Sequence, residues 1–511
     1  MKKVISRFWT GLMAVLTVIS MMAIEVFAAG IDDLPNVTEY AENADSAGYL
    51  IETLDDLAYV AANKTSFRTG KTLYLTNDLN VPAAAEDTEN KYQSIHDMSG
   101  LLASIDGQGH TISGLSLTAS WLGNYATTGF IKNLIFSNCH ITQAGWNTGL
   151  LISQYAKTDL TFENITMIGC SASKGSSNGL GLLIGQVSGT NAKVTLKNIR
   201  IENCVLNRDT ADNSAFLVGT FGTWNNPTET FDVDGIYMIN NEITGTANGQ
   251  KTGRGILFGE VTGTGSIKNV AVYNTAVSKD ADATVTNSLG IVVGGTKNNV
   301  STLTVENVMA YNNGENFTRI VHATAGNAKI SVQKVYSDAT HLVTGSVTNV
   351  TNDAPYTEAQ FKSGKAAYDA NAAIVETSLR TWEMAVNATY PTLGTGLPVA
   401  VIFQSENYSK TLYTNTSGTL IGLDDELLNA AVWEKTVTAE TVFTADEIIN
   451  EKIIEDLPGD ADGDGALTTA DATLLLQHLV GKLELEVADA DVNGDGIITI
   501  YDAVLLLQML A

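Results

Sequence analysis

Leu196-Lys197-Asn198-Ile199 is the clearest copy of a pattern that sets the architecture of this chain, because it returns at nearly constant spacing. In each copy a polar residue and then an asparagine, or once a glycine, separate two apolar residues. The copies are 131–134, 162–165, 196–199, 233–236, 267–270 and 305–308, with a weaker copy at 332–335. The asparagine or glycine of the first six stands at positions 133, 164, 198, 235, 269 and 307. Such a period is typical of a solenoid, in which each repeat forms one coil.

A second repeat, an apolar triplet flanked mostly by glycines, falls between copies of the first. Its copies are 149–153, 181–185, 215–219, 255–259 and 290–294. Two short strands per period, in phase over six coils, predict a mainly β fold: a right-handed parallel β-helix at about 70–345. A β-sandwich is the alternative, but its strands would not keep two motifs in phase. The 45 glycines and 7 prolines agree with many turned strands.

Two residue types recur at fixed places in the repeat. Cys139, Cys170 and Cys204 each lie six residues after a motif asparagine, which predicts one buried column on successive coils. A disulfide between neighbouring coils is the alternative, whereas the paired spacing of thiolate zinc sites is absent. The motif asparagines predict an amide ladder that satisfies backbone groups and its own members. They are Asn133, Asn164, Asn198, Asn269 and Asn307.

The chain begins with features of export. Lys2, Lys3 and Arg7 precede a mainly apolar run, so residues 1–28 are predicted to be a signal peptide cut near Ala28. A membrane anchor is the alternative, but the run is short and interrupted. No later run approaches about 18 apolar residues, so the mature protein is expected to have no membrane span. Helical apolar spacing at 51–60, with Thr53 as N-cap, predicts a helix that caps the first coil.

The solenoid resembles β-helix regions of Gram-positive surface proteins, in 74–79, 105–112 and the closing segments 356–364 and 390–394. The glycine-flanked triplets resemble the GLUG motif found in some of them. The expected β-helix domain is 29–397. Residues 398–455 weakly resemble small β repeats of surface proteins and are expected to be a β module or spacer. A carbohydrate-binding role for Trp433 and Tyr413 is the alternative there.

Near the C-terminus an acidic loop of twelve residues occurs twice, beginning at Asp460 and again at Asp491. Oxygen ligands at loop positions 1, 3, 5, 7 and 12 and a glycine at position 6 form the EF-hand pattern, except that Asp replaces Glu at position 12. The predicted ligands of two calcium ions are Asp460, Asp462, Asp464, Ala466 and Asp471, then Asp491, Asn493, Asp495, Ile497 and Asp502. Two plain acidic turns are the alternative, but each loop runs into a matching apolar helix.

Residues 456–511 resemble a dockerin domain, with duplicated calcium loops that are each followed by one helix. The resemblance implies calcium-dependent binding to a cohesin module of a scaffoldin or cell-surface protein, within a cellulosome-like, polysaccharide-degrading assembly. The implied location is extracellular, at the cell surface or in the cellulosome of a Gram-positive bacterium. The implied partner-binding residues are Thr469, Ala470, Leu476, Gln477, Ile500, Tyr501, Leu507 and Gln508.

The net charge of the chain and the absence of known catalytic and nucleotide-binding motifs narrow the functions that the sequence allows. The net charge of −27 argues against nucleic acid or an anionic membrane as partner. No metalloprotease, nucleophile-elbow, Walker or Rossmann motif occurs, and His110 more simply marks a strand end. A charged group, Asp232, Asp234, Arg254 and Lys268, is adjacent in coil order but matches no lyase signature, so catalytic residues stay unknown. A non-catalytic module that binds carbohydrate or a cell surface is therefore favoured over a polysaccharide lyase or glycosidase.

Overall fold

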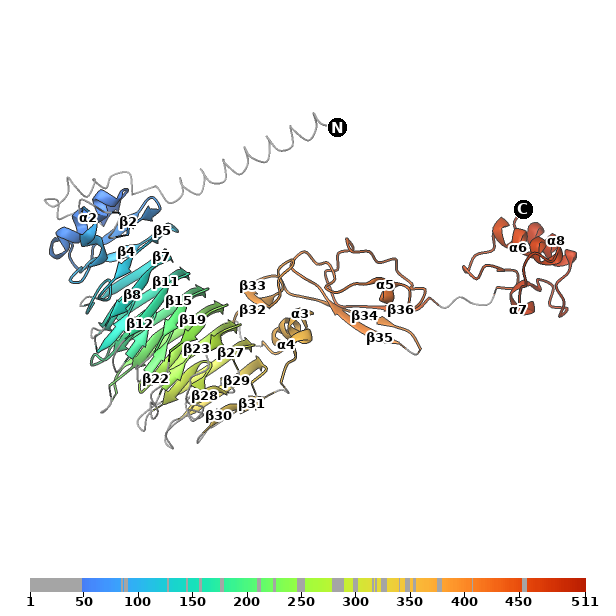
Figure 1. Ribbon diagram of the computed structural model, residues 1–511. Coiled ribbons are helices and arrows are strands. Elements are labelled where there is room, and N and C mark those ends of the chain that lie inside the picture. Colours follow the sequence, from blue (N-terminus) through green and yellow to red (C-terminus); the bar gives the residue numbers. More distant parts are fainter. Residues whose placement is uncertain are drawn as a thin grey trace, which may run out of the picture. The chain divides into compact units, whose positions relative to one another are not determined.

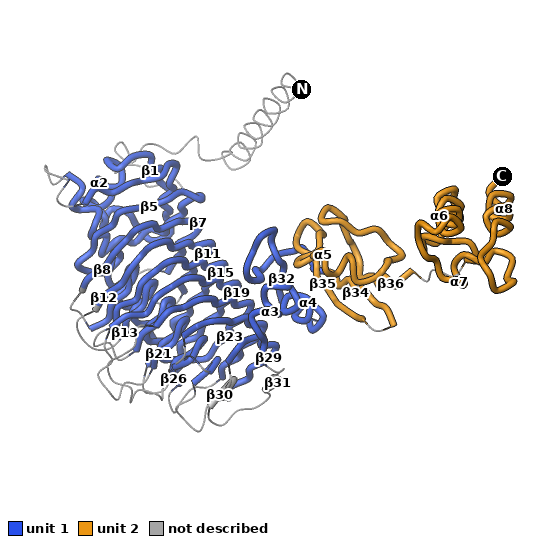
Figure 2. The backbone as a smooth tube through the Cα atoms, turned by 45° about the vertical axis from the view of Figure 1, so that its right-hand side comes forward, with its two compact units in different colours: residues 1–398 blue, residues 399–511 orange. Residues whose placement is uncertain are grey.

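The computed structural model describes most of the chain after residue 47. The described residues are 48–511 except 84–85, 87–90, 126–127, 144–145, 156–158, 175–178, 209–212, 224–226, 246–252, 278–288, 297–301, 315–316, 318, 323–328, 340, 345–349, 353–354, 375–378, 407 and 453–456. The expected signal peptide, 1–28, lies outside them. The chain divides into two compact units, Met1–Pro398 and Val399–Ala511 (Figure 2). Among the described helices, none is long and apolar enough to cross a membrane.

The first unit contains a parallel β-solenoid of about six turns (Figure 1). Its largest sheet, here called the ladder sheet, contains the longest strands of the coils, of 8 to 10 residues from β7 to β29. In spatial order its strands are β1 (Gly48–Ile51), β2 (Thr72–Leu75), β4 (Ser104–Asp106), β7 (Gly129–Ser137), β11 (Asp159–Ile168), β15 (Lys193–Glu202), β19 (Thr230–Ile239), β23 (Thr264–Tyr273), β27 (Leu303–Tyr311), β29 (Ile330–Ser337) and β31 (Val350–Asn352), with β3 (Leu79–Asn80) and β5 (Thr111–Ser113) beside them.

Three further parallel sheets complete the coils. The second contains β6 (Ser116–Leu117), β8 (His140–Gln143), β12 (Ser171–Lys174), β16 (Val205–Asn207), β20 (Glu242–Thr244) and β24 (Ala276–Val277). The third contains β9 (Asn147–Gly149), β13 (Gly179–Gly181), β17 (Asn213–Ala215), β21 (Gly253–Gly255) and β25 (Leu289–Gly290). The fourth contains β10 (Ile152–Tyr155), β14 (Ile184–Val187), β18 (Val218–Phe221), β22 (Phe258–Val261), β26 (Val293–Thr296), β28 (Arg319–His322) and β30 (His341–Thr344).

The coils therefore hold more strands than the repeat predicts. The middle coils place one strand in each of four sheets, whereas the sequence predicts two strands per period. The strands of the second and third sheets are only two to four residues long, too short for an alternating pattern to reveal them. The glycine-flanked triplets form the tight corner between the third and fourth sheets. There a Cβ on Gly219 would lie 2.4 Å from the backbone nitrogen of Leu180, so only glycine fits.

The parallel register builds the core from columns of identical positions. Phe162 pairs with Ile131 on one side and Leu196 on the other, and Leu196 pairs with Val233. These four side chains are completely buried. One continuous apolar cluster extends from Tyr49 to Ala339, so each coil is stabilised by its neighbours.

At the N-terminal end the predicted capping helix is present. α2 (Leu54–Ala62) begins after Thr53, whose side chain and that of Asp56 form a capping box. The predicted N-cap at Thr53 is confirmed, and Ile51, before this cap, pairs with Leu75 in β1–β2. Two short 3₁₀ helices follow, η2 (Lys64–Ser66) and η3 (Gln93–His96).

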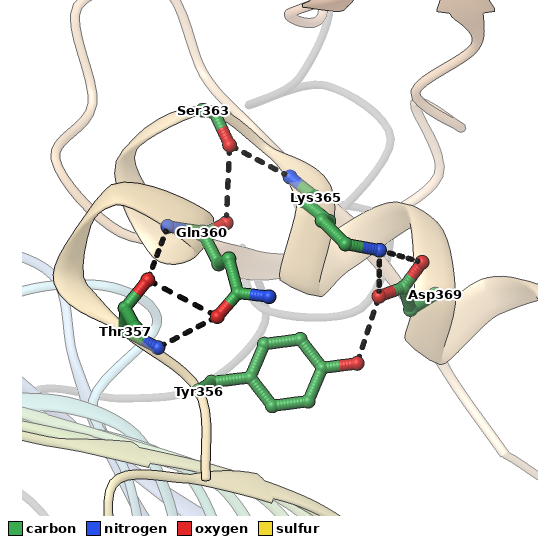
Figure 3. Close-up of polar contacts among 6 residues, drawn as sticks. All are labelled: Tyr356, Thr357, Gln360, Ser363, Lys365 and Asp369. Atoms are coloured by element: carbon green, nitrogen blue, oxygen red, sulfur yellow. Dashed lines mark hydrogen bonds and ion pairs between the residues drawn. The ribbon is translucent and has the colours of Figure 1, made fainter. Parts of the chain in front are cut away.

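After the last coil, the chain returns onto the outer face of the ladder sheet. This return segment, residues 355–397, contains α3 (Glu358–Lys362), α4 (Lys365–Ala372), β32 (Thr381–Glu383) and β33 (Thr392–Gly394). Figure 3 shows its first corner, where Thr357 and Gln360 cap α3 and the Tyr356 hydroxyl donates to Asp369 at 2.8 Å. Lys365 also pairs with Asp369, at 2.7 Å.

The return segment is held by the ladder sheet through amides and aromatic rings. The indole Nε1 of Trp382 donates to Asn307 Oδ1 at 2.7 Å, and the backbone N–H of Arg380 donates to Asn269 Oδ1 at 3.0 Å. The ring of Tyr390 stacks on that of Tyr273, with centroids 4.7 Å apart. Motif asparagines thus bind a segment that is distant in sequence.

The second unit begins with a small β module. β34 (Ala400–Gln404) pairs with β35 (Ser409–Tyr413) and β36 (Glu447–Asn450), and α5 (Asp425–Leu428) accompanies them. Trp433 donates its indole N–H to the Leu427 carbonyl at 3.0 Å and packs against Phe403. Tyr413 is buried. The carbohydrate-binding alternative therefore lacks support here, because both rings take part in the packing of the module.

Candidate functional site

The first aspartate of each acidic loop is held by the loop's own backbone. Asp460 Oδ2 accepts the Gly465 N–H at 2.7 Å, and its Oδ1 accepts the Asp464 N–H at 3.2 Å. In the second loop, Asp491 accepts from Gly496 at 2.6 Å and from Asp495 at 3.2 Å. Both aspartates are buried. The two loops have the same internal design, which two chance acidic turns would not share.

The last aspartate of each loop joins the loop to its helix. Asp471 accepts from the backbone and hydroxyl of Thr468 at 2.7 and 3.0 Å, and Asp502 accepts likewise from Thr499 at 2.8 and 2.9 Å. The threonines are the N-caps, so α6 (Thr469–Leu479) and α8 (Ile500–Met509) begin inside the loops, two residues before the last aspartate of each loop.

Hydrogen bonding keeps these terminal aspartates ionised. Burial alone would raise the pKa of Asp471, but hydrogen bonds from Thr468 and Asp462 outweigh it and lower the pKa. At Asp502, too, burial alone would raise the pKa. Hydrogen bonds from Thr499 and Asn493 outweigh burial and lower the pKa. Each side chain is an anion fixed in place before any cation binds.

The middle positions bring further oxygens to the first loop. One carboxylate oxygen from each of Asp460, Asp462 and Asp464 lies within 4.8 Å of the others. Partial desolvation, and to a smaller extent the neighbouring carboxylates, raise the pKa of Asp462. A donor set made only of oxygens fits a hard cation such as calcium.

In the second loop an amide takes the third position. Asn493 Oδ1 accepts the Asp495 N–H at 2.8 Å, and its Nδ2 donates to Asp495 Oδ2 at 3.0 Å. This loop carries one negative charge fewer than the first. Ala466 and Ile497 donate their N–H groups to Asp464 and Asp495, at 2.8 and 3.1 Å, and the ligand roles of their carbonyls stay predictions.

The two helices share a small core with α7 (Val487–Ala490). Ala472 and Leu475 of α6 and Ala503 and Leu506 of α8 are buried, at equivalent positions of the two repeats. The next residues outward, Leu476 and Leu507, are 42% and 43% exposed. The same buried residue types therefore recur in α6 and α8, and so does the exposed leucine next to them.

The outer surface also differs between the helices. Ile500 and Tyr501 are about 60% exposed at the start of α8, where α6 has exposed Thr469 and Ala470. Gln508 is exposed and Gln477 is partly exposed. All eight predicted partner-binding residues therefore reach the surface of these two helices.

Comparison with known proteins identifies this region. Residues 458–511 match the dockerin type I domain family. Residues 458–511 form a dockerin type I domain. Dockerin domains bind calcium and dock to cohesin modules in cellulosome-like complexes, and such proteins are typically extracellular or cellulosome-associated.

Comparisons of the whole chain with known proteins add little to the family match of residues 458–511. No curated protein matches it. A solved structure of a putative immunoglobulin A1 protease from Bacteroides ovatus is similar, with 18% identity over 70% of this chain and 97% of that chain. Its TM-score of 0.32 is too low to carry an argument about fold or function.

The charged group predicted on the solenoid does not form one site. Asp234 and Lys268 are Cα partners in the ladder sheet, but Asp234 accepts from Asn269 at 2.6 Å and pairs with Arg380 at 3.4 Å. Asp232 accepts from the Ser266 hydroxyl at 2.7 Å in the same sheet. Arg254 lies in the third sheet and is buried. His110 directly precedes β5 and lies 3.4 Å from Asp78, as expected of a strand end.

The predicted asparagine ladder is confirmed. Asn164 donates to Asn133, Asn198 to Asn164, and Asn307 to Asn269, each at 2.7 Å. The charge pattern beside it was missed, although sequence alternation could have revealed it. The position before each motif asparagine, or before the glycine that stands in its place, alternates in sign along the stack: Asp106, Lys132, Glu163, Lys197, Asp234, Lys268 and Glu306.

The cysteine column is confirmed and is longer than predicted. Cys139, Cys170 and Cys204 are buried and free, and the backbone N–H of Cys170 donates to Cys204 Sγ at 3.3 Å. Later coils place buried polar side chains at the same repeat position, beginning with Asn241, which accepts the Cys204 N–H at 2.9 Å. The column continues through Thr275 and Asn313.

Proposed function

We propose that this chain is an exported component of a cellulosome-like, polysaccharide-degrading complex of a Gram-positive bacterium. Its dockerin holds two calcium ions and docks to a cohesin of a scaffoldin or cell-surface protein. Its solenoid is a non-catalytic module that binds carbohydrate or a cell surface. The observation that carries the proposal is the pair of acidic loops, whose aspartates make the same hydrogen bonds in both copies of the repeat.

The proposed calcium ligands follow the loop positions. The first ion would be held by Asp460, Asp462, Asp464, the Ala466 carbonyl and Asp471. The second would be held by Asp491, Asn493, Asp495, the Ile497 carbonyl and Asp502. Four anionic ligands in the first loop against three in the second favour tighter binding in the first.

The proposed cohesin-binding surface lies on the two helices. The matched pairs Leu476–Gln477 and Leu507–Gln508 support docking in either of two orientations related by the internal repeat. The unmatched pairs Thr469–Ala470 and Ile500–Tyr501 favour one of them, because α8 offers more apolar area for burial.

The non-catalytic role of the solenoid is supported by the partners of its acidic groups. Asp234, the Cα partner of the candidate base Lys268, already bonds to Asn269 of the ladder sheet and to Arg380 of the return segment. A lyase or glycosidase needs carboxylates that face the substrate. The proposed division is a signal peptide at 1–28, the solenoid at 29–397, a spacer at 398–455 and the dockerin at 456–511.

The test of docking is calorimetric titration of the full mature chain against cohesins of the same organism, with calcium or with chelator. Tight binding is expected only with calcium, and its loss is expected in Asp460→Ala combined with Asp491→Ala. Binding that survives either treatment would contradict the proposed calcium switch. In parallel, incubation with pectins, xylans and glucans should release no reducing or unsaturated ends. Steady turnover of any of these polysaccharides would instead support a polysaccharide lyase or glycosidase.

A further inference from the structure

A single tryptophan stands out on the solenoid surface. Trp146, directly before β9, is 77% exposed and is the most exposed large apolar side chain in the described part of the chain. A side chain of this exposure keeps most of its indole surface in contact with water. Exposed tryptophans are instead frequent anchors for ligands with an apolar face.

A strip of amide side chains begins at the next residue. This amide strip consists of Asn147, Gln154 and Gln186, all half-buried in the third and fourth sheets. Asn147 Nδ2 donates to Gln186 Oε1 at 2.6 Å. Gln154 Nε2 donates to the Ser188 hydroxyl at 2.6 Å. Gln154 and Gln186 are Cα partners in β10 and β14, so they are neighbours on successive coils.

The strip leaves one donor group and one acceptor group open. Within the described residues, Gln186 Nε2 donates to no protein group and Gln154 Oε1 accepts from none. The other end of each amide is already bonded, so the open ends are held in fixed orientations. The spacing of about 4.8 Å between strands places them side by side.

The strip does not continue as half-buried amides into the next two described coils. In the next two coils Thr220 and Glu260 occupy the position of Gln186, and both are almost completely buried. Asn213, which takes the place of Asn147 two coils on, donates to Thr220 at 3.1 Å. Among these three equivalent positions, only Gln186 is half-buried, and it belongs to the strip that begins next to Trp146.

We propose that Trp146 and the amide strip form the glycan-contacting site of the solenoid, and that its ligand is a neutral polysaccharide. This inference rests on the proposed carbohydrate-binding role. A pyranose ring presents a C–H face that can stack on an indole, and its hydroxyls both donate and accept. Amides supply the matching donor and acceptor without charge, so the three strip residues favour a neutral glycan over a uronic-acid polymer.

The experiment measures retardation of the full mature chain, with calcium, in native gels that contain soluble neutral glycans: xylan, mannan or mixed-linkage β-glucan. Trp146→Ala is expected to weaken binding about tenfold, and Gln186→Ala by a smaller factor. Trp146→Phe keeps a stacking ring and should retain part of the affinity. The control is Val480→Ala, which shortens a 69% exposed apolar side chain of the dockerin and should leave retardation unchanged.

Fluorescence gives a second measurement. Glycan should shift the tryptophan emission of the wild type, and Trp146→Phe should abolish the shift while it still binds. Retardation of Trp146→Ala equal to that of the wild type would overturn this site and leave the carbohydrate role standing, with Trp146 assigned to a protein contact. A wild type that no glycan retards would overturn the carbohydrate role itself.

Discussion

At the scale of the residue, the motif asparagines combine two properties that no other side chain combines as well. Asn133, Asn164, Asn198, Asn269 and Asn307 have φ between 52° and 57°, in the left-handed region that asparagine tolerates better than most residues. Their amides each offer a donor and an acceptor, so they bond to the same group one coil away. The strand can therefore bend at each coil without leaving polar groups unpaired.

Asn164 tests this combination. Asn164→Ala removes hydrogen bonds to both neighbours and puts a Cβ residue at positive φ, so we expect a loss of about 2 kcal/mol in the free energy of unfolding. Asn164→Gly removes the same bonds but accepts the backbone angle. Denaturant titration should therefore rank glycine above alanine, the reverse of their usual order within a strand. The usual order would show that the backbone angle is unimportant here.

Gly235 is the one gap in the ladder, and the structure explains it. Gly235 has φ +82°, and a Cβ there would lie 2.7 Å from a guanidinium nitrogen of Arg380, which also pairs with Asp234. Gly235→Asn should displace Arg380 and lower the local stability of the return segment by about 0.5–1 kcal/mol. Hydrogen exchange of residues 379–383 measures the loss. In an Arg380→Ala background the same substitution should have little further effect, and an undiminished effect would contradict the steric explanation.

The cysteine column makes a different prediction. Cys170→Asp buries a charge among apolar neighbours and should prevent folding, whereas Cys170→Ala should fold with a modest loss of stability. Soluble yield and circular dichroism distinguish the two. The hydrogen bond to Cys170 and burial raise the pKa of the Cys139 thiol, so labelling by a thiol reagent should be slow until the protein unfolds. Fast labelling of the native protein would contradict the buried column.

At the scale of the element, the dockerin helices depend on the loops that precede them. Thr468 and Thr499 cap their helices and also hydrogen-bond to the terminal loop aspartates. The shared core contains few large side chains, so it is thin for a domain of this size. Helix formation is therefore expected to be linked to cation binding.

Removal of calcium tests this linkage. Chelator should abolish amide protection in α6 and α8 of the full chain, because uncompensated carboxylates in the loops repel one another. The solenoid strands, such as β11 and β15, should keep their protection and serve as the internal control. Hydrogen exchange with mass spectrometry resolves both regions. Helices that stay protected without calcium would contradict metal-linked folding.

At the scale of the whole molecule, the two compact units have separate cores and separate proposed tasks. Asp460→Ala combined with Asp491→Ala should abolish cohesin docking and leave glycan retardation unchanged. Trp146→Ala should instead weaken glycan retardation and leave cohesin docking unchanged. Titration against a cohesin and native gels with glycan measure the two activities on the same preparations. Loss of both activities in either variant would contradict the division of labour.

Sequence alone determined the features whose partners repeat at a fixed interval. The calcium loops are local, since every predicted ligand of an ion lies within one short loop, and the coil period is visible because each coil needs the same side chain at the same place. The ladder and the buried cysteines followed from that period. The extra strands did not, because strands of two to four residues carry no periodic signal.

Only the tertiary structure decided which surfaces of the solenoid are covered. The return segment meets Asn269 and Asn307 across 111 and 75 residues, through single hydrogen bonds and ring contacts that leave no pattern in the chain. That packing gives Asp234 a partner and explains Gly235. The exposure of Trp146 beside an open amide strip is equally a result of packing, because burial depends on residues distant in sequence and a periodic motif reports only its own neighbours.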